Sequence, residues 1–219
     1  MRTVCIIPAR GGSKGIPRKN LQEIGGGSLL YWAVITAKKS SLIDGIFVST
    51  EDDEIAEMAM MYGANVINRP AELAADGTPS APVIWHAVQQ MERPERYILV
   101  QATAYPQSVD TMDHVIQAMS TFDADTAISV RRDTLFLFRR GKCGYGYKIN
   151  QHSQMPRQLS EPEYLQTGAC VAGTVDFLQK TGELIGGRIA LVEDSSTVVD
   201  IDTPLDLDIA RALHAYRNN

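Results

Sequence analysis

A basic, glycine-rich segment near the start of the chain, residues 8–20 (PARGGSKGIPRKN), has the composition of an anion-binding loop. It holds four cations, three glycines, a serine and an asparagine, and it directly follows the apolar run of residues 4–7. Glycines let backbone N–H groups approach an anion closely, and flexible cations neutralise its charge. The spacing differs from that of a P-loop and of the dinucleotide motif G-x-G-x-x-G. The segment therefore predicts a polyphosphate site of another kind, and the alternative is a solvated basic turn.

Two aspartates near the end of the chain could bind a metal ion. In residues 199–202 (VDID), strand alternation places Asp200 and Asp202 on one face and the two apolar residues on the other. Carboxylates about 7 Å apart along a strand repel each other unless a cation lies between them. Magnesium prefers such oxygen ligands and usually shares them with substrate phosphates. The pair predicts a Mg²⁺ site; the alternative is one solvated aspartate and one that merely precedes a helix.

The composition argues against nucleic acid or a membrane as the main partner. The chain has 219 residues, of which 44% are hydrophobic and 21% charged, and its net charge is −5. Nucleic-acid binding usually requires a basic face, and no apolar run is long enough for a transmembrane helix or a signal peptide. The three cysteines are widely spaced and contain no Cys-x-x-Cys motif. They are expected to be reduced thiols of a cytoplasmic protein.

Short apolar runs alternate with helical patterns along most of the chain, and these elements must position the two sites. The alternation predicts an α/β fold, in which a mostly parallel sheet is flanked by helices in a single domain, residues 1–219. The long polar loop at residues 69–80 follows a strand, where such folds bind ligands. The expected strands are residues 4–7, 46–49, 64–67, 97–100, 125–130, 168–173 and 189–192; the expected helices are one capped by Ser28 and those at 51–62, 81–90, 108–122, 174–181 and 204–216.

Two helix starts have clear capping signals. Thr203, Pro204 and Asp206 form a strong start for the last helix. Thr50 is expected to cap the second helix, and the acids at residues 51–54 would then complement its dipole. Because this accounts for these acids structurally, we assign them no catalytic role.

Residues 131–167 interrupt the α/β pattern. They contain no helical repeat, and residues 135–138 and 145–149 are expected to be two strands joined by residues 141–144. The apolar patch at residues 135–138 needs a cover, which a second subunit could supply. The segment predicts an inserted arm for dimerisation, and the alternative is an ordinary surface hairpin.

The basic segment, extended to residues 7–20, resembles the signature of the acylneuraminate cytidylyltransferases, also called CMP-sialic acid synthetases. Further matches follow in the same order: VST at residues 48–50 before acids, R-P-x-x-L-x-x-D at residues 69–76, and VDIDT at residues 199–203. The resemblance covers nearly the whole chain. It implies a nucleotide-diphospho-sugar transferase-like (Rossmann-like) fold with the arm at 131–167, a homodimer or a dimer of dimers, CTP as co-substrate, and Mg²⁺.

The resemblance also implies an activity and the residues that perform it. The chain would activate a nine-carbon, nonulosonic (sialic-type) acid with CTP, giving the CMP-sugar and diphosphate. By position, the residues that would contact the nucleotide are Ala9, Arg10, Gly11, Ser13, Lys14, Lys19, Asn20, Arg69 and Ser80. Those that would contact the sugar acid are Gln101, Thr103, Arg157, Gln158 and Tyr164. Asp200 and Asp202 would hold Mg²⁺, and the catalytic residues would be Arg10, Lys14 and Asp202.

Two segments on the sugar side depart from the family pattern. Residues 101–105 read QATAY, where the family usually has Gln-Pro/Ala-Thr-Ser-Pro, and Thr167-Gly168 stands where the family has Asn-Gly. Because both changes lie on the sugar side, the resemblance supports the use of CTP better than it supports any particular sugar. The alternatives are a cytidylyltransferase for another 3-deoxy sugar acid and a CTP-binding protein without sugar turnover.

Overall fold

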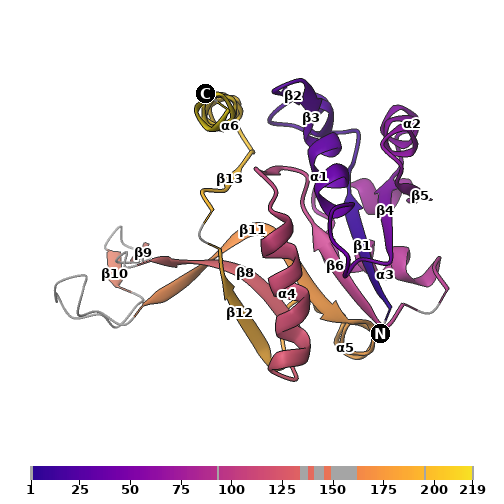
Figure 1. Ribbon diagram of the computed structural model, residues 1–219, viewed down its shortest axis with the longest axis vertical. Coiled ribbons are helices and arrows are strands. Elements are labelled where there is room, and N and C mark those ends of the chain that lie inside the picture. Colours follow the sequence, from indigo (N-terminus) through magenta and orange to yellow (C-terminus); the bar gives the residue numbers. More distant parts are fainter. Residues whose placement is uncertain are drawn as a thin grey trace.

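A seven-stranded, mostly parallel sheet crosses the molecule (Figure 1). The computed structural model describes residues 2–92, 94–133, 138–140, 146–148, 162–194 and 196–218, and only the backbone within 138–140 and 146–148. The strands of the sheet are β1 (Thr3–Pro8), β4 (Gly45–Thr50), β5 (Asn65–Asn68), β6 (Arg96–Val100), β8 (Thr126–Asp133), β11 (Glu163–Thr174) and β12 (Ile189–Glu193). Their order is β12-β8-β11-β6-β1-β4-β5, and of these seven only β11 runs antiparallel to its neighbours. The predicted α/β fold is confirmed.

Helices cover both faces of this sheet. On one face, α1 (Leu29–Ala37), α2 (Asp53–Met61) and α4 (Val109–Thr121) contribute to one buried apolar cluster. On the other face, α3 (Ser80–Gln89) and α5 (Val175–Thr181) contribute to a second cluster. The last helix, α6 (Pro204–Arg217), lies apart from both layers at the top of Figure 1. Each sheet face is thus shielded from water, as a mostly parallel sheet requires.

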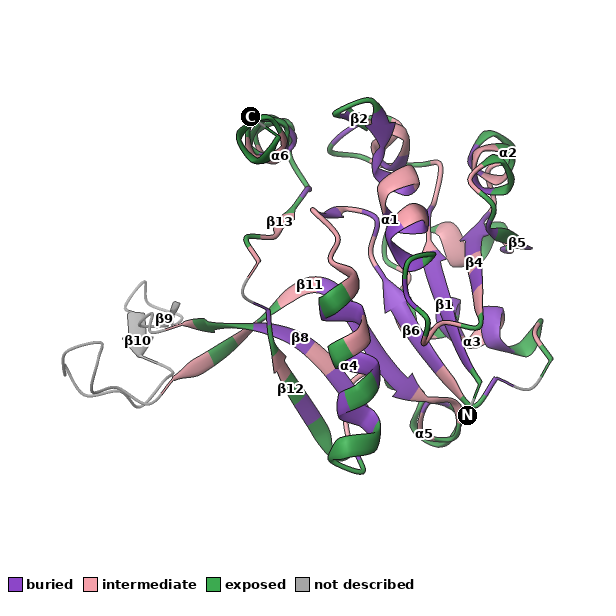
Figure 2. Ribbon diagram, viewed as in Figure 1, coloured by how far each residue is buried: buried purple, intermediate pink, exposed green. Residues whose placement is uncertain are grey.

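Strand β1 shows why the first apolar run is continuous. Cys5 and Ile7 belong to the cluster with α1 and α4, whereas Val4 and Ile6 belong to the cluster with α3. All four are fully buried, and the central strands carry the buried colour in Figure 2. A strand covered on both faces needs an apolar residue at every position. The strand therefore delivers the basic segment that follows to the carboxyl-terminal edge of the sheet.

A third, smaller core joins the end of the chain to the basic segment. Its buried residues include Ile16, Tyr105 and Ile201. Ile201 is fully buried between the two exposed aspartates, as predicted, although the strand there, β13, ends at Asp200 and does not extend over all four residues. Two short strand pairs border this core: β2 (Glu23–Ile24) with β3 (Gly27–Ser28), and β7 (Ala104–Tyr105) with β13 (Val199–Asp200). Burial of Ile201 therefore holds Asp200 and Asp202 next to the basic segment.

The helix starts confirm one capping prediction and correct the other. Thr203 and Asp206 form the predicted capping box at the start of α6. At α2 the prediction is wrong, because Asp52 rather than Thr50 is the N-cap; its carboxylate accepts a first-turn N–H at 3.0 Å. Thr50 instead ends β4, and its hydroxyl accepts the N–H of Asp52 at 3.1 Å. Glu51 therefore precedes the helix and is free to point elsewhere.

The arm begins as a continuation of the main sheet. Strands β8 and β11 stay paired beyond the helical layers, out to the register of Asp133 with Glu163. Further out, β9 (Phe138–Arg140) pairs antiparallel with β10 (Gly146–Lys148). The rest of the predicted hairpin, residues 135–137, 141–145 and 149, lies outside the described residues, as do Arg157 and Gln158. Among the helices that the structure describes, none is long and apolar enough to cross a bilayer.

Candidate active site

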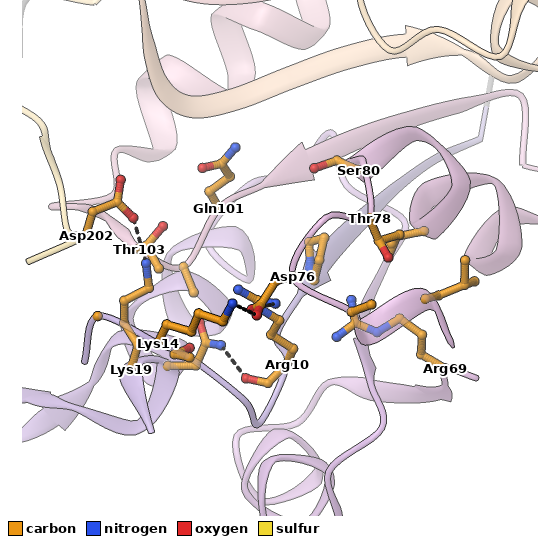
Figure 3. Close-up of a pocket in the computed structure, with 18 of the residues that line it drawn as sticks. Arg10, Lys14, Lys19, Arg69, Asp76, Thr78, Ser80, Gln101, Thr103 and Asp202 are labelled. Carbon is orange, nitrogen blue, oxygen red and sulfur yellow. Dashed lines mark hydrogen bonds and ion pairs between the residues drawn. The ribbon is translucent and has the colours of Figure 1, made fainter. Parts of the chain in front are cut away.

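A cavity of about 510 Å³ opens where several parallel strands end (Figure 3). Its walls come from the segments that follow β1, β5 and β6, and from Asp202 before α6. The carboxyl ends of parallel strands share one sheet edge, which is where such folds bind ligands. The predicted site residues that line this cavity are Arg10, Ser13, Lys14, Lys19, Asn20, Arg69, Ser80, Gln101, Thr103 and Asp202.

The segment of residues 9–20, here called the basic loop, fits tightly between two neighbouring segments. The side-chain amide of Asn20 donates to the carbonyl of Arg10 at 3.0 Å and so ties the two ends of the loop together. A Cβ atom on Gly11 would lie 2.2 Å from a carboxylate oxygen of Asp52. A Cβ atom on Gly15 would lie 2.4 Å from the backbone carbonyl of Asp202. Glycine at both positions therefore lets the loop approach the acids on either side.

Acids after β4 hold the back of the basic loop. Glu51 accepts the N–H of Gly11 at 2.8 Å. Asp52 and Glu54 both form ion pairs with Arg18, whose backbone is left-handed at φ 54°. Hydrogen bonds from Arg18 are the main reason that the pKa of Asp52 lies below its usual value. The acids to which we assigned no catalytic role thus stabilise the loop's conformation.

Acids pair with the cations that face the cavity (Figure 3). Asp76 contacts Arg10 at 2.7 Å and Lys14 at 2.6 Å. Lys19 contacts Asp202 at 2.9 Å. Hydrogen bonds from Lys14 and then Arg10 lower the pKa of Asp76. The Lys14–Asp76 pair is exposed, and exposed ion pairs are weak, so a polyphosphate could take over this cation. Arg10 and Lys19 are more shielded, with side chains 32% and 17% exposed.

The far wall of the cavity combines apolar surface with a buried guanidinium group. Leu73, Val83 and Leu99 line it, alongside Arg69 and Ser80. The side chain of Arg69 is only 4% exposed. Within the described residues its Nε atom has no hydrogen-bond partner. An apolar surface with a few directional polar groups suits a flat nucleobase. The 69–80 loop itself contains a short 3₁₀ helix, η2 (Ala71–Ala74), and α3 begins at Ser80, one residue earlier than predicted.

Asp200 and Asp202 are the residues that would share a magnesium ion, and of the two only Asp202 lines the cavity. Desolvation and then the charge of Asp202 raise the pKa of Asp200, whose carboxylate accepts the hydroxyl of Thr103 at 3.4 Å. Such mutual repulsion is relieved when a cation binds. Over the described ranges, no group of three or more His, Cys, Asp or Glu side chains is placed to hold a metal ion. Two carboxylates alone suit Mg²⁺, which takes its other ligands from phosphates and water.

The sugar-side segments meet next to these aspartates. Gly168, with φ +76°, is so close that a Cβ there would lie 3.5 Å from Asp200 and 3.8 Å from the side-chain oxygen of Gln101. Thr167 turns its hydroxyl away, to within 2.7 Å of the Ser129 hydroxyl. The two departures from the family pattern therefore lie beside the predicted metal site.

Some predicted residues lie elsewhere. Ala9, the first residue of the basic loop, is fully buried. The N–H of Gly11 points to Glu51 and not into the cavity, so Gly11 contributes to the shape of the loop. Tyr164 lies on β11, where its hydroxyl donates to Glu193 at 3.0 Å, and it does not line the cavity. The positions of Arg157 and Gln158 are not among those described.

Sequence reasoning missed two acids at this site. Asp76 belongs to the quoted R-P-x-x-L-x-x-D pattern, yet it was given no role. Glu51 was explained by the helix dipole, although it directly follows the carboxyl end of β4. Because Glu51 follows the carboxyl end of a parallel strand, it could have been predicted to lie at the same sheet edge as the basic loop.

Comparisons with known proteins identify the family of the chain. Residues 4–167 match the cytidylyltransferase family. The chain is 31% identical to CMP-N,N'-diacetyllegionaminic acid synthase of Campylobacter jejuni, over 98% of this chain and 96% of that protein. It is 29% identical to pseudaminic acid cytidylyltransferase of the same species, over 98% of this chain and 97% of that protein.

A solved structure shares the fold. The structure of CMP:2-keto-3-deoxy-manno-octonic acid synthetase complexed with CTP gives a TM-score of 0.77 at 18% identity, covering 99% of this chain and 100% of that one. The family match spans most of the chain, and a relative above 30% identity spans nearly all of it. The protein therefore belongs to the cytidylyltransferase family, as the resemblance of its basic loop predicted.

Proposed function

We propose that this protein transfers CMP from CTP to a nonulosonic (sialic-type) acid and releases diphosphate. The observation that carries the proposal is one cavity that holds the basic loop, an apolar wall with Arg69, and Asp202. These are the three parts that a triphosphate, a base and a metal ion need. The names of the two relatives, which act on legionaminic and pseudaminic acids, support a nine-carbon sugar acid.

The nucleotide would lie along the basic loop with its base against the far wall. Arg10, Ser13, Lys14 and Lys19 would bind the phosphates, replacing the present acid partners of the cations. Arg69 and Ser80 would bind the base or ribose, since both line the wall that also carries Leu73, Val83 and Leu99. Asn20 is 6% exposed and is engaged with the loop backbone, so it supports the nucleotide site chiefly through the shape of the loop.

The reaction is a displacement at the α-phosphorus of CTP. A hydroxyl oxygen of the sugar acid forms a bond to that phosphorus and loses its proton to solvent. The bond between the α-phosphorus and the bridging oxygen breaks, and diphosphate leaves with the electron pair. Arg10 and Lys14 would neutralise charge that develops on the triphosphate, and Gln101 and Thr103 would orient the sugar acid.

Asp200 and Asp202 would hold the Mg²⁺ ion. When bound, Mg²⁺ neutralises phosphate oxygens and makes a nearby hydroxyl more acidic. Its presence would also release Lys19 from Asp202, which leaves Lys19 available for a phosphate.

The subunit arrangement and the compartment are part of the proposal. The β8–β11 extension projects from the sheet in Figure 1 and could pair with a second copy, giving a homodimer through residues 131–167. Tyr164 lies on this extension. By the family resemblance, Tyr164 and the residues Arg157 and Gln158, which lie outside the described residues, would serve the partner's site. Cys5 and Cys170 are buried, free thiols, which supports a reducing compartment such as the cytoplasm.

A panel of sugar acids tests the proposed reaction. Diphosphate release is measured with CTP, UTP or ATP, with Mg²⁺ or with a chelator, and with legionaminic, pseudaminic, N-acetylneuraminic and eight-carbon 3-deoxy acids. We expect release only with CTP, Mg²⁺ and a nine-carbon acid. Turnover of the eight-carbon acid alone would establish the alternative sugar class. CTP binding without release on any acid would show a protein that binds the nucleotide without sugar turnover.

A further inference from the structure

Glu51 lies behind the cavity and connects the basic loop to Arg69. It follows β4 directly and does not line the cavity. One carboxylate oxygen, Oε1, accepts the N–H of Gly11 at 2.8 Å. The other, Oε2, accepts Nη2 of Arg69 at 2.7 Å. A single side chain thus contacts both the basic loop and the guanidinium group on the base side.

These contacts are shielded from water. The side chain of Glu51 is 21% exposed and that of Arg69 is 4% exposed. Burial acts to raise the pKa of Glu51, but hydrogen bonds from Arg69 and the Gly11 N–H outweigh it, so the pKa lies below its usual value. The carboxylate is therefore charged at neutral pH, and charge-assisted hydrogen bonds of this kind are short and directional.

The acids that follow Glu51 in the sequence show what is specific about it. Asp52 and Glu54 both contact Arg18, which does not line the cavity. Glu51 instead holds a residue whose guanidinium group forms part of the cavity wall, as Figure 3 shows for Arg69. Among the described residues, Nε of Arg69 has no hydrogen-bond partner. The orientation of the Arg69 guanidinium group therefore depends on its contact with Glu51.

We infer that Glu51 is a positioning residue that fixes Arg69 and the basic loop in one arrangement, so that base recognition and triphosphate binding occur together. The inference rests on the proposed function, because it assigns the base to Arg69. Glu51 itself would touch no substrate. It would act through Arg69, which contacts the base, and through the N–H of Gly11, which shapes the basic loop. A misplaced positioning group typically weakens the contacts it supports, without removing them.

The test compares Glu51→Gln with Glu57→Gln. The amide keeps an oxygen for the Gly11 N–H but presents an NH₂ group to Arg69, so it breaks one contact. Glu57→Gln is the matched control, since Glu57 is an exposed glutamate on α2 that does not line the cavity. We expect Glu51→Gln to raise the Kd for CTP about tenfold and to lower the preference for CTP over UTP. Glu57→Gln should leave both within twofold.

A double-mutant cycle distinguishes positioning from loss of stability. If Glu51 acts through Arg69, Glu51→Gln should weaken CTP binding much less in an Arg69→Ala background than in the native chain. Thermal melting checks that each variant is folded. If Glu51→Gln does not fold, Glu51→Asp gives the same readouts, because the shorter side chain keeps the charge but cannot reach both partners.

The outcomes separate this inference from the proposed reaction. Unchanged CTP affinity and unchanged CTP/UTP preference in a folded Glu51 variant would overturn the positioning role, and so would fully additive losses in the cycle. These readouts measure nucleotide binding alone. A failure of sugar turnover in the native protein would instead overturn the proposed function and leave the result for Glu51 standing.

Discussion

The proposed nucleotide half and the proposed sugar half of the site are built by different means. In the nucleotide half, ion pairs and charge-assisted hydrogen bonds connect residues far apart in sequence, such as Arg10 with Asp76 and Glu51 with Arg69. In the sugar half, Gln101 and Gly168 are placed largely by backbone contacts; the N–H of Gln101, for example, donates to the Ala169 carbonyl at 3.2 Å. Charged residues at fixed spacing can be recognised in a sequence, whereas backbone contacts leave little trace in it. This difference explains why the sequence indicates the nucleotide, CTP, more clearly than it indicates which sugar acid is used.

The largest expected effect comes from removing charge in the nucleotide half. Lys14→Ala and Asp202→Ala should each lower kcat about 100- to 1,000-fold, because each removes a preorganised electrostatic contact to the triphosphate or its metal ion. Both side chains are well exposed, so the fold should survive, which thermal melting checks. Lys39→Ala, at an exposed lysine after α1, is the control and should retain native turnover. Near-native turnover of Asp202→Ala would exclude the metal role of this residue.

A smaller and more selective effect is expected in the sugar half. Gln101→Ala should raise the KM for the sugar acid about tenfold, the cost of one lost hydrogen bond to a charged ligand, while the KM for CTP stays within twofold. Steady-state kinetics with each substrate varied in turn measures both values. Gln117→Ala, at an exposed position on α4, should change neither. An increase confined to the KM for CTP would mean that Gln101 belongs to the nucleotide half.

Asp76 tests whether the ion pairs within the cavity compete with the nucleotide. Asp76→Asn should tighten the binding of CTP and of diphosphate about two- to fivefold, because Arg10 and Lys14 then lose a weak, exposed partner. Isothermal titration calorimetry measures both ligands, and Asp123→Asn is a control in which an exposed ion pair far from the cavity is removed. Weaker binding would show the reverse role, in which Asp76 orients the two cations for the triphosphate.

The smallest effect concerns stability at low pH. Glu51 and Asp52 both have pKa values below the usual ones, so the unfolded chain binds their protons more readily than the folded chain. Their contribution to stability is fully present above the unfolded-state pKa values, about 4, and is lost as the pH falls through the folded-state values. Denaturant unfolding between pH 7 and pH 3 should show this loss. Asp52→Asn should show a shallower decline, whereas an identical pH dependence would mean that the pair with Arg18 does not matter for stability.

Much of the fold could be predicted because local rules and tertiary packing agree. The continuous apolar run of β1, the Ser28 cap of α1 and the capping box of α6 all gave elements that the structure confirms. The cap of α2 was predicted wrongly, because threonine and aspartate are both good N-caps and the choice depends on where β4 ends. Local sequence does not determine that point, since pairing with β1 and β5 extends β4 to Thr50.

By itself, the sequence determined the chemistry of this protein. The basic loop, the R-P-x-x-L-x-x-D pattern and the aspartate pair each need particular residue types at fixed spacing, and those can be read directly. Only the tertiary structure decided which groups act together. Glu51 meets Gly11 and Arg69, and Asp76 meets Arg10 and Lys14, across separations of 18 to 66 residues. The physical reason is that a parallel sheet gathers the ends of distant strands at one edge, where charges that are remote in sequence come into contact.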